Sequence, residues 1–401
     1  MTVTTATTSA TATTATPRRS GSTKAEIVAE AAGLFGPRGF AAVSVQEIAD
    51  RVGITPGAIY RHFASKEAVL HAVMFDCIGA WLAAADLEPP SIKRIVDQSV
   101  QLVVDRPGQL ATYVRERHRA DGATKRELAR REAVLSRRWG DAIRAARPGL
   151  SQPDVVVRQQ AVNGALSSLA LRPAGLDRPR LRALATAGLV ALAKCRCETS
   201  HDDVSHRQNA RERAYRPPVS RRQQIMTVAM RLFAERGYHG VSMDDIGDAV
   251  GMSGPSLYEY VSGKSGILLD AFDQAGAFVI AGAAAALRDA TSPADALDRL
   301  ARSFIEIAFD HVDLLVVTIR EGASLPDVDR PRLTRRQRDL HEQWAAVLRQ
   351  VRGGDVSPAD ARSLVRSAIA LVSVVAWQRR GDSPSVGSTV ALVRAFLTAA
   401  D

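Results

Sequence analysis

The sequence contains the same segment twice. Residues 53–66 read GITPGAIYRHFASK, and residues 251–264 read GMSGPSLYEYVSGK. With a constant shift of 198 positions, residues 27–70 match residues 225–268 at 15 of 44 positions. A repeat this long indicates a duplicated domain, because solenoid repeats have periods of roughly 20–50 residues. The chain is therefore expected to fold as two related units.

The similarity returns later in the chain with a shift of 205 positions. It is carried by matched pairs: Arg115-Glu116 with Arg320-Glu321, Arg130-Arg131 with Arg335-Arg336, and Trp139 with Trp344. Each copy is thus roughly 185 residues long, enough for a pair of small domains. Between the copies, Pro217-Pro218 lies in a polar and charged stretch and stops any helix. The boundary between the units is expected near residues 205–215.

The start of the first copy predicts two helices. Apolar residues in 23–36 recur at helical spacing, and Gly36-Pro37 is expected to end that helix. Ser44 and Glu47 have the spacing of a capping box, in which the Ser oxygen accepts from the third helical amide and Glu47 reaches back. A second, short helix therefore begins here.

A third and a fourth helix follow. Gly53 ends the second helix, and Thr55-Pro56 opens the third, because proline is favoured in a first turn. Ser65 caps a long fourth helix that begins at Lys66. Two short helices joined by a tight turn and braced by another helix form a helix-turn-helix.

The remainder of each copy is also expected to be helical. The predicted helices cover 124–147, 153–171 and 178–195 in the first copy, and 331–351, 358–378 and 386–400 in the second. Residues 155–171 and 361–377 are apolar on nearly all sides. A helix of that kind is deeply buried or lies in an interface.

The sequence therefore predicts an all-α protein of two tandem units. Each unit has an N-terminal three-helix helix-turn-helix domain and a C-terminal helical regulatory domain. The expected segments are a disordered Thr/Ala tail with a basic end (1–19), the first helix-turn-helix domain (20–66), the first C-terminal domain (67–200), a linker (201–217), the second helix-turn-helix domain (218–264) and the second C-terminal domain (265–401).

The net charge of +10 permits nucleic-acid binding but does not establish it. Residues 1–200 hold 28 Lys and Arg against 18 Asp and Glu, whereas residues 201–401 hold 25 of each. The basic excess therefore lies entirely in the first copy.

Other features point to a reducing cytoplasm. Three cysteines exclude a disulfide framework. Cys195 and Cys197 form a lone Cys-x-Cys near two histidines, for which an incidental pair is expected rather than a metal site. The longest uncharged apolar run, 274–287, is too short to span a bilayer, and the first 16 residues do not look like a secretion signal.

The extended pattern of both copies resembles the TetR/AcrR family of transcriptional regulators over roughly 50 residues. In the first copy the pattern consists of Ile27, Ala31, Leu34-Phe35, Gly39-Phe40, Ser44, Ile48-Ala49, Gly53-Ile54, Gly57, Ile59-Tyr60, His62-Phe63, Lys66 and Leu70. The resemblance implies that the helix from Pro56 to His62 lies in the major groove of DNA.

The resemblance also implies DNA-contacting residues in the first copy: Arg18, Arg19, Lys24, Ser44, Val45, Gln46, Thr55, Gly57, Ala58, Tyr60, His62 and Lys66. Tyr60 and His62 are expected near phosphates, and the basic arm before residue 25 is expected along the backbone or in the minor groove. The alternatives without DNA contact are a half-buried packing role for Tyr60, a solvated His62 and a solvated basic arm.

The second copy departs from the pattern. Ser253-Gly254-Pro255 replaces Thr55-Pro56-Gly57, yet the proline still falls in the first turn, so the helix is expected to survive. The net charge of 241–264 is −3, against +1 for 43–66. The equivalent candidate residues are Ser242, Met243, Ser253, Gly254, Ser256, Tyr258, Tyr260 and Lys264. The sequence supports both a DNA-contacting second module and a purely structural one.

The resemblance implies a double-stranded DNA operator and a small-molecule effector as partners. Candidate pocket residues are Trp81, Tyr113, Arg115, Trp139, Phe304, Arg320 and Trp344, although ordinary core positions account for the aromatic ones and internal salt bridges account for the arginines equally well. Because family members act as homodimers, the fused copies are expected to form either a pseudodimer within one chain or a homodimer of two chains.

Other functional classes find less support. The sequence has no Gly-rich phosphate loop, no metal-spaced cluster and no nucleophile elbow, so neither an enzyme nor a cofactor is expected. A helical protein-binding adaptor that has lost DNA binding in one or both modules is the alternative.

Overall fold

The computed structural model describes residues 20–171, 178–197, 219–378 and 384–400, and these residues contain helices and no strand. The first unit consists of α1 (Ser20–Arg38), α2 (Val45–Val52), α3 (Pro56–His62), α4 (Lys66–Ala84), α5 (Ile92–Asp105), α6 (Pro107–Glu116), α7 (Gly122–Ala146), α8 (Gln152–Leu171) and α9 (Arg178–Lys194). The protein is all-α, as predicted.

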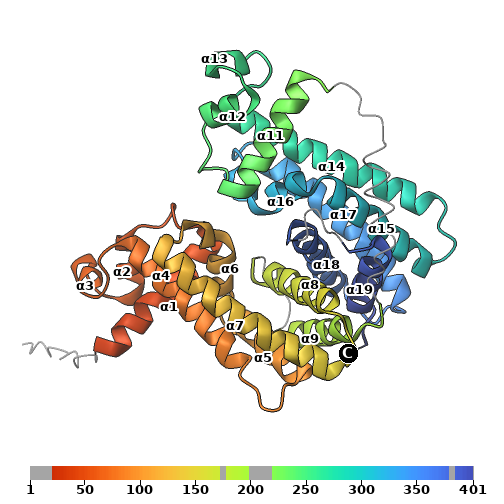
Figure 1. Cartoon of the computed structure of the whole chain (residues 1–401), viewed down its shortest axis with the longest axis horizontal. Coiled ribbons are helices and arrows are strands. Elements are labelled where there is room, and N and C mark those ends of the chain that lie inside the picture. Colours follow the sequence, from red (N-terminus) through yellow and green to blue (C-terminus); the bar gives the residue numbers. More distant parts are fainter. Residues whose placement is uncertain (1–19, 172–177, 198–218, 379–383, 401) are drawn as a thin grey trace, which may run out of the picture.

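The second unit repeats this order of helices. It consists of α11 (Arg221–Arg236), α12 (Met243–Val250), α13 (Gly254–Leu257), α14 (Lys264–Arg288), α15 (Pro293–Asp310), α16 (Val312–Arg320), α17 (Arg330–Val351), α18 (Pro358–Gln378) and α19 (Val386–Leu397). We call α1–α3 the first reader and α11–α13 the second reader. In Figure 1 the readers lie at two separate corners, with α8 and α18 between them.

Most predicted helix ends agree with the structure, and the end of α1 does not. The sequence places the end of this helix at Gly36-Pro37, but α1 continues to Arg38 with Pro37 inside it. A proline in the last turn removes one backbone hydrogen bond, and here α1 is also held by α6. A Cβ on Gly36 would lie 2.8 Å from the Cα of Gly108, so the two backbones touch at a pair of glycines.

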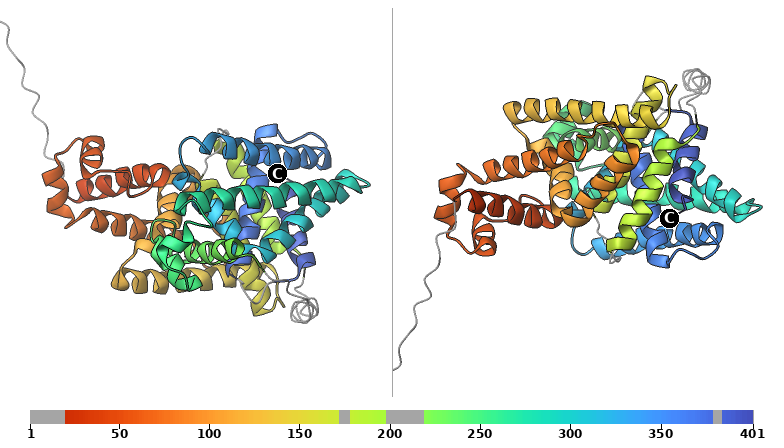
Figure 2. Two further views of the ribbon diagram at one scale, coloured as in Figure 1. Left: turned by 90° about the horizontal axis from the view of Figure 1, so that it is seen from above. Right: turned by 90° about the horizontal axis from the view of Figure 1, so that it is seen from below.

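The two readers differ in whether their hydrophobic core is shared with the rest of the chain. The first reader, with α4, has its own hydrophobic core around Phe35, Ile48, Ile59 and Leu70. The core of the second reader is continuous with that of both C-terminal domains. Figure 2 shows α1–α4 extending away from the other helices in both views.

The two units pack together through equivalent helices. The helices α8 and α18, both predicted to be buried, make the most extensive helix–helix contact in the described chain, and α9 packs against α19 beside them. A Cβ on Gly164 of α8 would lie 2.7 Å from the carbonyl oxygen of Ala370 and 2.7 Å from the Cα of Leu371, both in α18. The crossing is therefore a direct contact between backbones.

Among the described residues, α4 and α14 are long and apolar enough to cross a membrane by length and composition. The uncharged run 274–287 lies within α14, whereas the apolar stretch of α4 is interrupted by Asp76. In α4, Val69, Leu70, Val73 and Met74 are packed in the core of the first reader, and a core helix of a soluble protein passes the same test.

The close crossing of α8 and α18 leads to a prediction about glycine. In an isolated helix, Gly→Ala stabilises by roughly 1 kcal/mol. Gly79 of α4 has nothing within 4 Å of an added Cβ, so Gly79→Ala is expected to raise stability. Gly164→Ala is expected to lower it by about 1–3 kcal/mol, because a methyl group would push α8 off α18. Urea unfolding of both variants tests this, and an unchanged or higher stability of Gly164→Ala contradicts it.

Candidate nucleic-acid interface

The first helix of the turn, α2, begins with the predicted capping box. The backbone N–H of Glu47 donates to Ser44 Oγ at 3.2 Å, and the N–H of Ser44 donates to Glu47 Oε2 at 2.8 Å. Arg38 Nη1 lies 2.6 Å from Glu47 Oε1 and thereby links this cap to α1. The Ser44 amide, followed by Arg38, lowers the pKa of Glu47 from its ordinary 4.5 to about 2. These contacts fix where α2 starts.

The turn between α2 and α3 depends on a left-handed glycine. Gly53 has φ +74° and donates its N–H to carbonyls of the last turn of α2, as a helix C-cap does. Pro56 occupies the first turn of α3. Ile59 and Phe63 are buried in the core of the first reader and fix the rotation of α3. The opposite face of α3 is therefore turned to solvent.

The exposed face of α3 carries the residues that were predicted to contact DNA. Tyr60 is 54% exposed, so the packing alternative for this residue is wrong. Thr55 and Gly57 are exposed, while Ala58 and His62 are half-buried. At the start of α2, Ser44 and Gln46 are exposed and Val45 is half-buried. The structure thus brings these residues to one surface, and contact with DNA stays a prediction for each of them.

One basic residue of this surface was not among the predicted contacts. Arg61 is exposed next to Tyr60 and makes no hydrogen bond or ion pair among the described residues. The neighbouring Arg38 and Arg51 are engaged with Glu47 and Glu30. The sequence could have indicated Arg61, because it lies in the last turn of α3 between Tyr60 and His62. The TetR/AcrR pattern does not specify this position.

The predicted lysines lie over aromatic rings. Lys66 Nζ is 4.2 Å from the centre of the Phe40 ring, and desolvation lowers its pKa. Lys24 Nζ is 5.4 Å from the centre of the Phe63 ring. Arg18 and Arg19 lie outside the described residues. Contact with DNA stays a prediction for both Lys24 and Lys66.

The second reader keeps the first helix of the motif. Ser242 caps α12, and Asp245 completes a capping box with the Ser242 amide at 2.7 Å. Hydrogen bonds from Ser242 lower the pKa of Asp245. Gly251 has φ +69°, as Gly53 does in the first reader. The turn itself is therefore preserved.

The second helix of this motif survives with its proline in the first turn, as expected, but it is shorter than in the first reader. The α13 helix has 4 residues, against 7 in α3. Tyr258 N–H donates to Pro255 O at 3.2 Å and Tyr260 N–H to Leu257 O at 3.0 Å, so the chain tightens into turns with i→i−3 bonds after Leu257. Gly263, with φ +95°, replaces the capping Ser65 and offers no side-chain cap.

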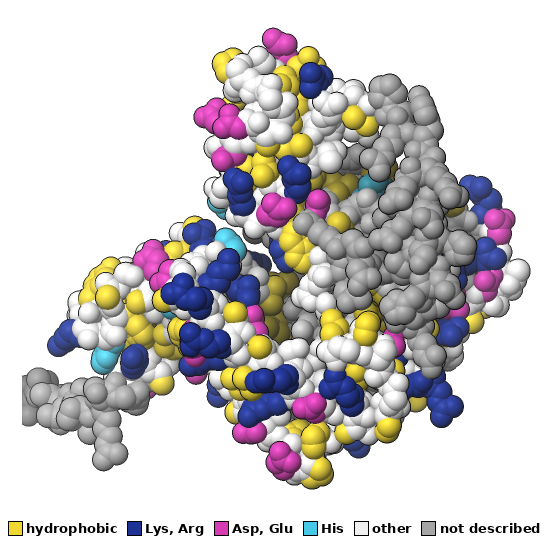
Figure 3. Space-filling view, in the orientation of Figure 1, with side chains coloured by type: hydrophobic (Ala, Val, Ile, Leu, Met, Phe, Trp, Pro, Cys, Tyr) yellow, Lys and Arg dark blue, Asp and Glu magenta, His cyan; other side chains and the backbone are white. Residues whose placement is uncertain are grey.

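The surface of the second reader differs chemically from that of the first. Tyr258 is 60% exposed and Tyr260 is 39% exposed, and Glu259 is exposed between them. Figure 3 shows acidic side chains along the outer edge of this reader and clusters of Lys and Arg over the first unit. Of the other candidates, Ser242 and Ser253 are exposed, and Met243, Gly254 and Ser256 are half-buried.

Lys264 is held by the protein. Its Nζ donates to Tyr238 O at 3.0 Å and to Val241 O at 2.9 Å, and it lies 4.4 Å from the centre of the Tyr238 ring. Two of its three N–H donors are thus used internally. One donor remains for the predicted phosphate contact.

The recurring Arg-Glu pair fastens each reader to its C-terminal domain. Glu116 Oε1 accepts the N–H of Phe40 at 3.0 Å, and Glu321 Oε1 accepts the N–H of Tyr238 at 3.2 Å. Arg115 Nη1 donates to the carbonyl of Pro37 at 3.1 Å, so it binds the end of α1. Glu116 also accepts from Arg119 Nε at 2.8 Å, so this member of the pair takes part in an internal salt bridge. Binding of a ligand by Arg115 or Arg320 stays a prediction.

The remaining candidate pocket residues also lie in packed surroundings. Trp81 and Trp139 are buried in the core, and Phe304 meets Trp344 edge-on with ring centres 6.2 Å apart. Tyr113 donates to Glu132, and burial raises its pKa. Arg320 donates to Ala234 O at 3.5 Å and lies over the Trp377 ring.

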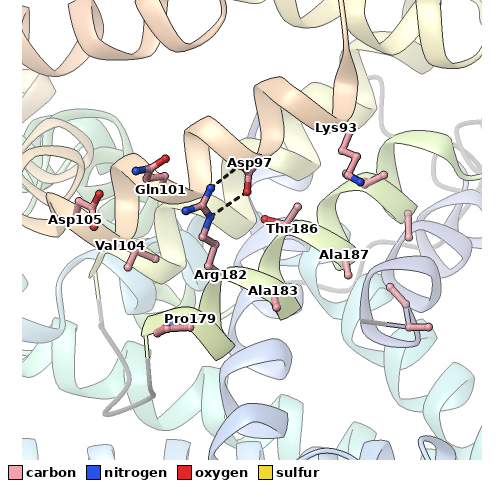
Figure 4. A pocket seen from close by; sticks show the side chains of 14 residues that line it. Lys93, Asp97, Gln101, Val104, Asp105, Pro179, Arg182, Ala183, Thr186 and Ala187 are labelled. Carbon is pink, nitrogen blue, oxygen red and sulfur yellow. Dashed lines mark hydrogen bonds and ion pairs between the residues drawn. The ribbon is translucent and has the colours of Figure 1, made fainter.

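A cavity of about 780 Å³ lies between α5 and α9, beside residues 399–400. Arg182 crosses it to Asp97, with Nη2–Oδ2 at 2.6 Å (Figure 4). No candidate pocket residue from the sequence lines this cavity.

Comparisons with known proteins agree with this geometry. A family model described as bacterial regulatory proteins of the tetR family matches residues 27–73 and again 225–271. A second model, described as a tetracyclin repressor-like C-terminal domain, matches residues 290–381. Both readers therefore match one family.

Characterised relatives match parts of the chain. The transcriptional activator FasR of Mycolicibacterium smegmatis is 35% identical over 97 residues, which are 24% of this chain and 42% of FasR. The transcriptional regulator TcmR of Streptomyces glaucescens is 29% identical over 28% of this chain and 61% of TcmR. The chain thus spans less than two thirds of the length of either relative.

The chain is also similar to solved structures, each of which covers less than half of it. A TetR-family regulator from Bordetella parapertussis covers 44% of this chain and 94% of its own, with 23% identity and a TM-score of 0.42. The ketosteroid regulator KstR2 of Mycobacterium tuberculosis covers 44% and 91%, with 23% identity and a TM-score of 0.39.

The two turns with their left-handed glycines and capped helices define a protein of the helix-turn-helix class. The chain belongs to the TetR family of bacterial regulatory proteins and contains two tandem TetR-like units.

The capping box yields a prediction on pH. The pKa of Glu47 is lower in the folded protein than the ordinary value of 4.5, so the carboxylate stabilises the first reader above about pH 4.5. This contribution is lost as the pH falls towards 2. Glu47→Gln is therefore expected to lose less stability than the wild type between pH 5 and pH 3 in urea unfolding. Glu88→Gln, an exposed carboxylate outside the reader, serves as the control. Equal losses in Glu47→Gln and wild type contradict the prediction.

Proposed function

We propose that the chain is a sequence-specific DNA-binding transcriptional regulator in which the two units of one chain act as a pseudodimer. The observation that carries the proposal is the exposed face of α3, with Tyr60, Arg61 and Thr55 turned to solvent by the burial of Ile59 and Phe63. A helix presented in this way fits the major groove, with side chains free to meet base edges and phosphates. Membership of the TetR family supports the same function.

The pseudodimer is supported by the packing of α8 on α18. These helices are equivalent in the two units, and Gly164 of α8 lies against Ala370 and Leu371 of α18 where they cross. One chain thereby carries two readers, as a homodimer carries two. A regulator built this way acts on an operator with two unlike half-sites, whereas a homodimer of identical readers acts on a palindrome.

We assign most of the sequence discrimination to the first reader. Its recognition helix is longer, and Arg61 adds a positive charge where the second reader has Glu259. Acidic side chains near phosphates weaken the release of counterions that supplies non-specific affinity. The second reader still exposes Tyr258 and Tyr260, which can donate to phosphate oxygens. We therefore assign it a weaker, backbone-directed contact.

We further propose that the regulator is a cytoplasmic repressor that responds to a small molecule. The tetracyclin repressor-like match over residues 290–381 supports a ligand-responsive C-terminal domain. The contacts of Glu116 and Glu321 with the reader backbones offer the mechanical link, because a shift of α6 or α16 would move a reader. The relatives include both activators and repressors, since FasR is named an activator and KstR2 of Mycolicibacterium smegmatis is named a repressor.

The test is a selection of binding sites from a random duplex library with wild type, Tyr60→Ala and Tyr258→Ala. We expect two dissimilar half-sites. Tyr60→Ala should weaken binding to the selected duplex about 10- to 100-fold, the size of one hydrogen bond to a charged group, and Tyr258→Ala should weaken it less. Affinity should fall steeply with salt, because phosphate contacts release counterions.

Two outcomes contradict the proposal. A palindrome that is sensitive only to Tyr60→Ala makes the second unit a scaffold in a homodimer. The absence of any enriched motif in modest salt favours the protein-binding adaptor instead. Tyr60 and Tyr258 are both exposed, so neither substitution is expected to unfold the protein.

A further inference from the structure

Two cysteine side chains meet at the end of α9. Cys195 and Cys197 follow Lys194, the last residue of that helix, and their sulfur atoms are 3.2 Å apart. Both residues are half-buried, so a small reagent can reach them. No third Cys, His, Asp or Glu in the described chain joins them as a metal-binding group. The pair therefore differs from an isolated cysteine, because each sulfur has a second sulfur within reach.

The pair lies at the junction of the two units. Cys195 Sγ lies 3.6 Å from the carbonyl oxygen of Ala391, which belongs to α19 of the second unit. Nearby, a Cβ on Gly188 of α9 would lie 2.8 Å from the ring of Phe396 in α19, so the helices are in close contact here. A chemical change at Cys195 therefore occurs at the contact between α9 and α19.

A buried arginine holds the cysteine turn. Arg158 of α8 is 1% exposed, and its Nη2 donates to the carbonyls of Cys195 at 2.9 Å and Cys197 at 2.5 Å. The same nitrogen is 3.6 Å from Cys197 Sγ. Its nearest carboxylate, Asp154, has Oδ1 3.7 Å from Nη1. A guanidinium this close to the turn disfavours a metal cation and favours a thiolate on either sulfur.

We propose that Cys195 and Cys197 are a redox-active pair that closes an intrachain disulfide when the protein meets a peroxide. The geometry supports this step because the sulfurs are already in contact and the turn that carries them is fixed by Arg158. The site needs no change in the packing of other helices before it reacts.

The two sulfurs have different roles in the reaction. The Cys195 thiolate attacks one peroxide oxygen, the O–O bond breaks, and Cys195 becomes a sulfenic acid while hydroxide leaves. The Cys197 thiol then attacks the Cys195 sulfur, the S–S bond forms, and water leaves with the sulfenic oxygen. In sum, two thiols are oxidised by one peroxide, which is reduced to two waters.

The titration of the two thiols fits these roles. The hydrogen bond with Cys197 and, to a smaller extent, the nearby Arg158 lower the pKa of Cys195 to about 6. The same hydrogen bond and burial raise the pKa of Cys197. Cys195 is thus the attacking sulfur and Cys197 the resolving one. The third cysteine, Cys77, is buried, and burial raises its pKa to about 12, so it is expected to stay unreacted.

The test uses the reduced full-length protein and hydrogen peroxide. We expect the intact mass to fall by two hydrogens and the free thiols to fall from three to one, with a Cys195–Cys197 link in the peptide map. Cys77→Ser is expected to close the same link. In Cys197→Ser, Cys195 should stop at the sulfenic acid and be trapped by dimedone. Cys195→Ser should react at least tenfold more slowly than the wild type.

The wild-type mass and peptide map do not depend on how any variant folds. Retention of all three thiols under peroxide overturns the proposal. A link between two chains, or a link that includes Cys77, overturns it as well. Equal reactivity of Cys195→Ser and wild type contradicts the role of Cys195.

Discussion

The close crossing of α8 and α18 is the contact on which the arrangement of this protein depends. It is possible because Gly164 has no side chain at the point where the α18 backbone passes. Helices at such short range gain van der Waals contact around the crossing, and the apolar faces of both are buried. Since each helix belongs to one unit, this single contact places the two readers on one body.

Each reader is joined to that body through its first helix, with α1 packed on α6 and α11 packed on α16. Glu116 and Glu321 accept the same type of reader amide in the two units. In the first unit alone, α1 and α6 also touch at Gly36 and Gly108. The first reader nevertheless keeps a separate core, whereas the core of the second continues into both C-terminal domains. The two units thus share a plan and differ in how each reader is held.

Much of this fold could be predicted from local sequence patterns. The spacing of Ser44 and Glu47, and the position of Gly53, determine the turn through hydrogen bonds between near neighbours. The length of α13 could not be predicted in this way. Pro255 still falls in the first turn of α13, so no local sequence rule marks the helix as short.

The candidate site shows the same limit. The exposure of Tyr60 agrees with the DNA-facing position that the resemblance implies for it. The contacts of Arg115 and Glu116 join residues about 76 positions apart or more, and no local pattern reveals such partners. The hydrogen bonds that Lys264 donates to the carbonyls of Tyr238 and Val241 could not be predicted for the same reason, because these partners lie 26 and 23 positions earlier in the chain.

The central claim is that one chain supplies both readers. Native mass spectrometry of the protein bound to its selected duplex tests it most directly. The account predicts one chain per duplex, even with protein in excess over DNA. A complex of two chains on one duplex, with no single-chain complex at any ratio, would contradict it.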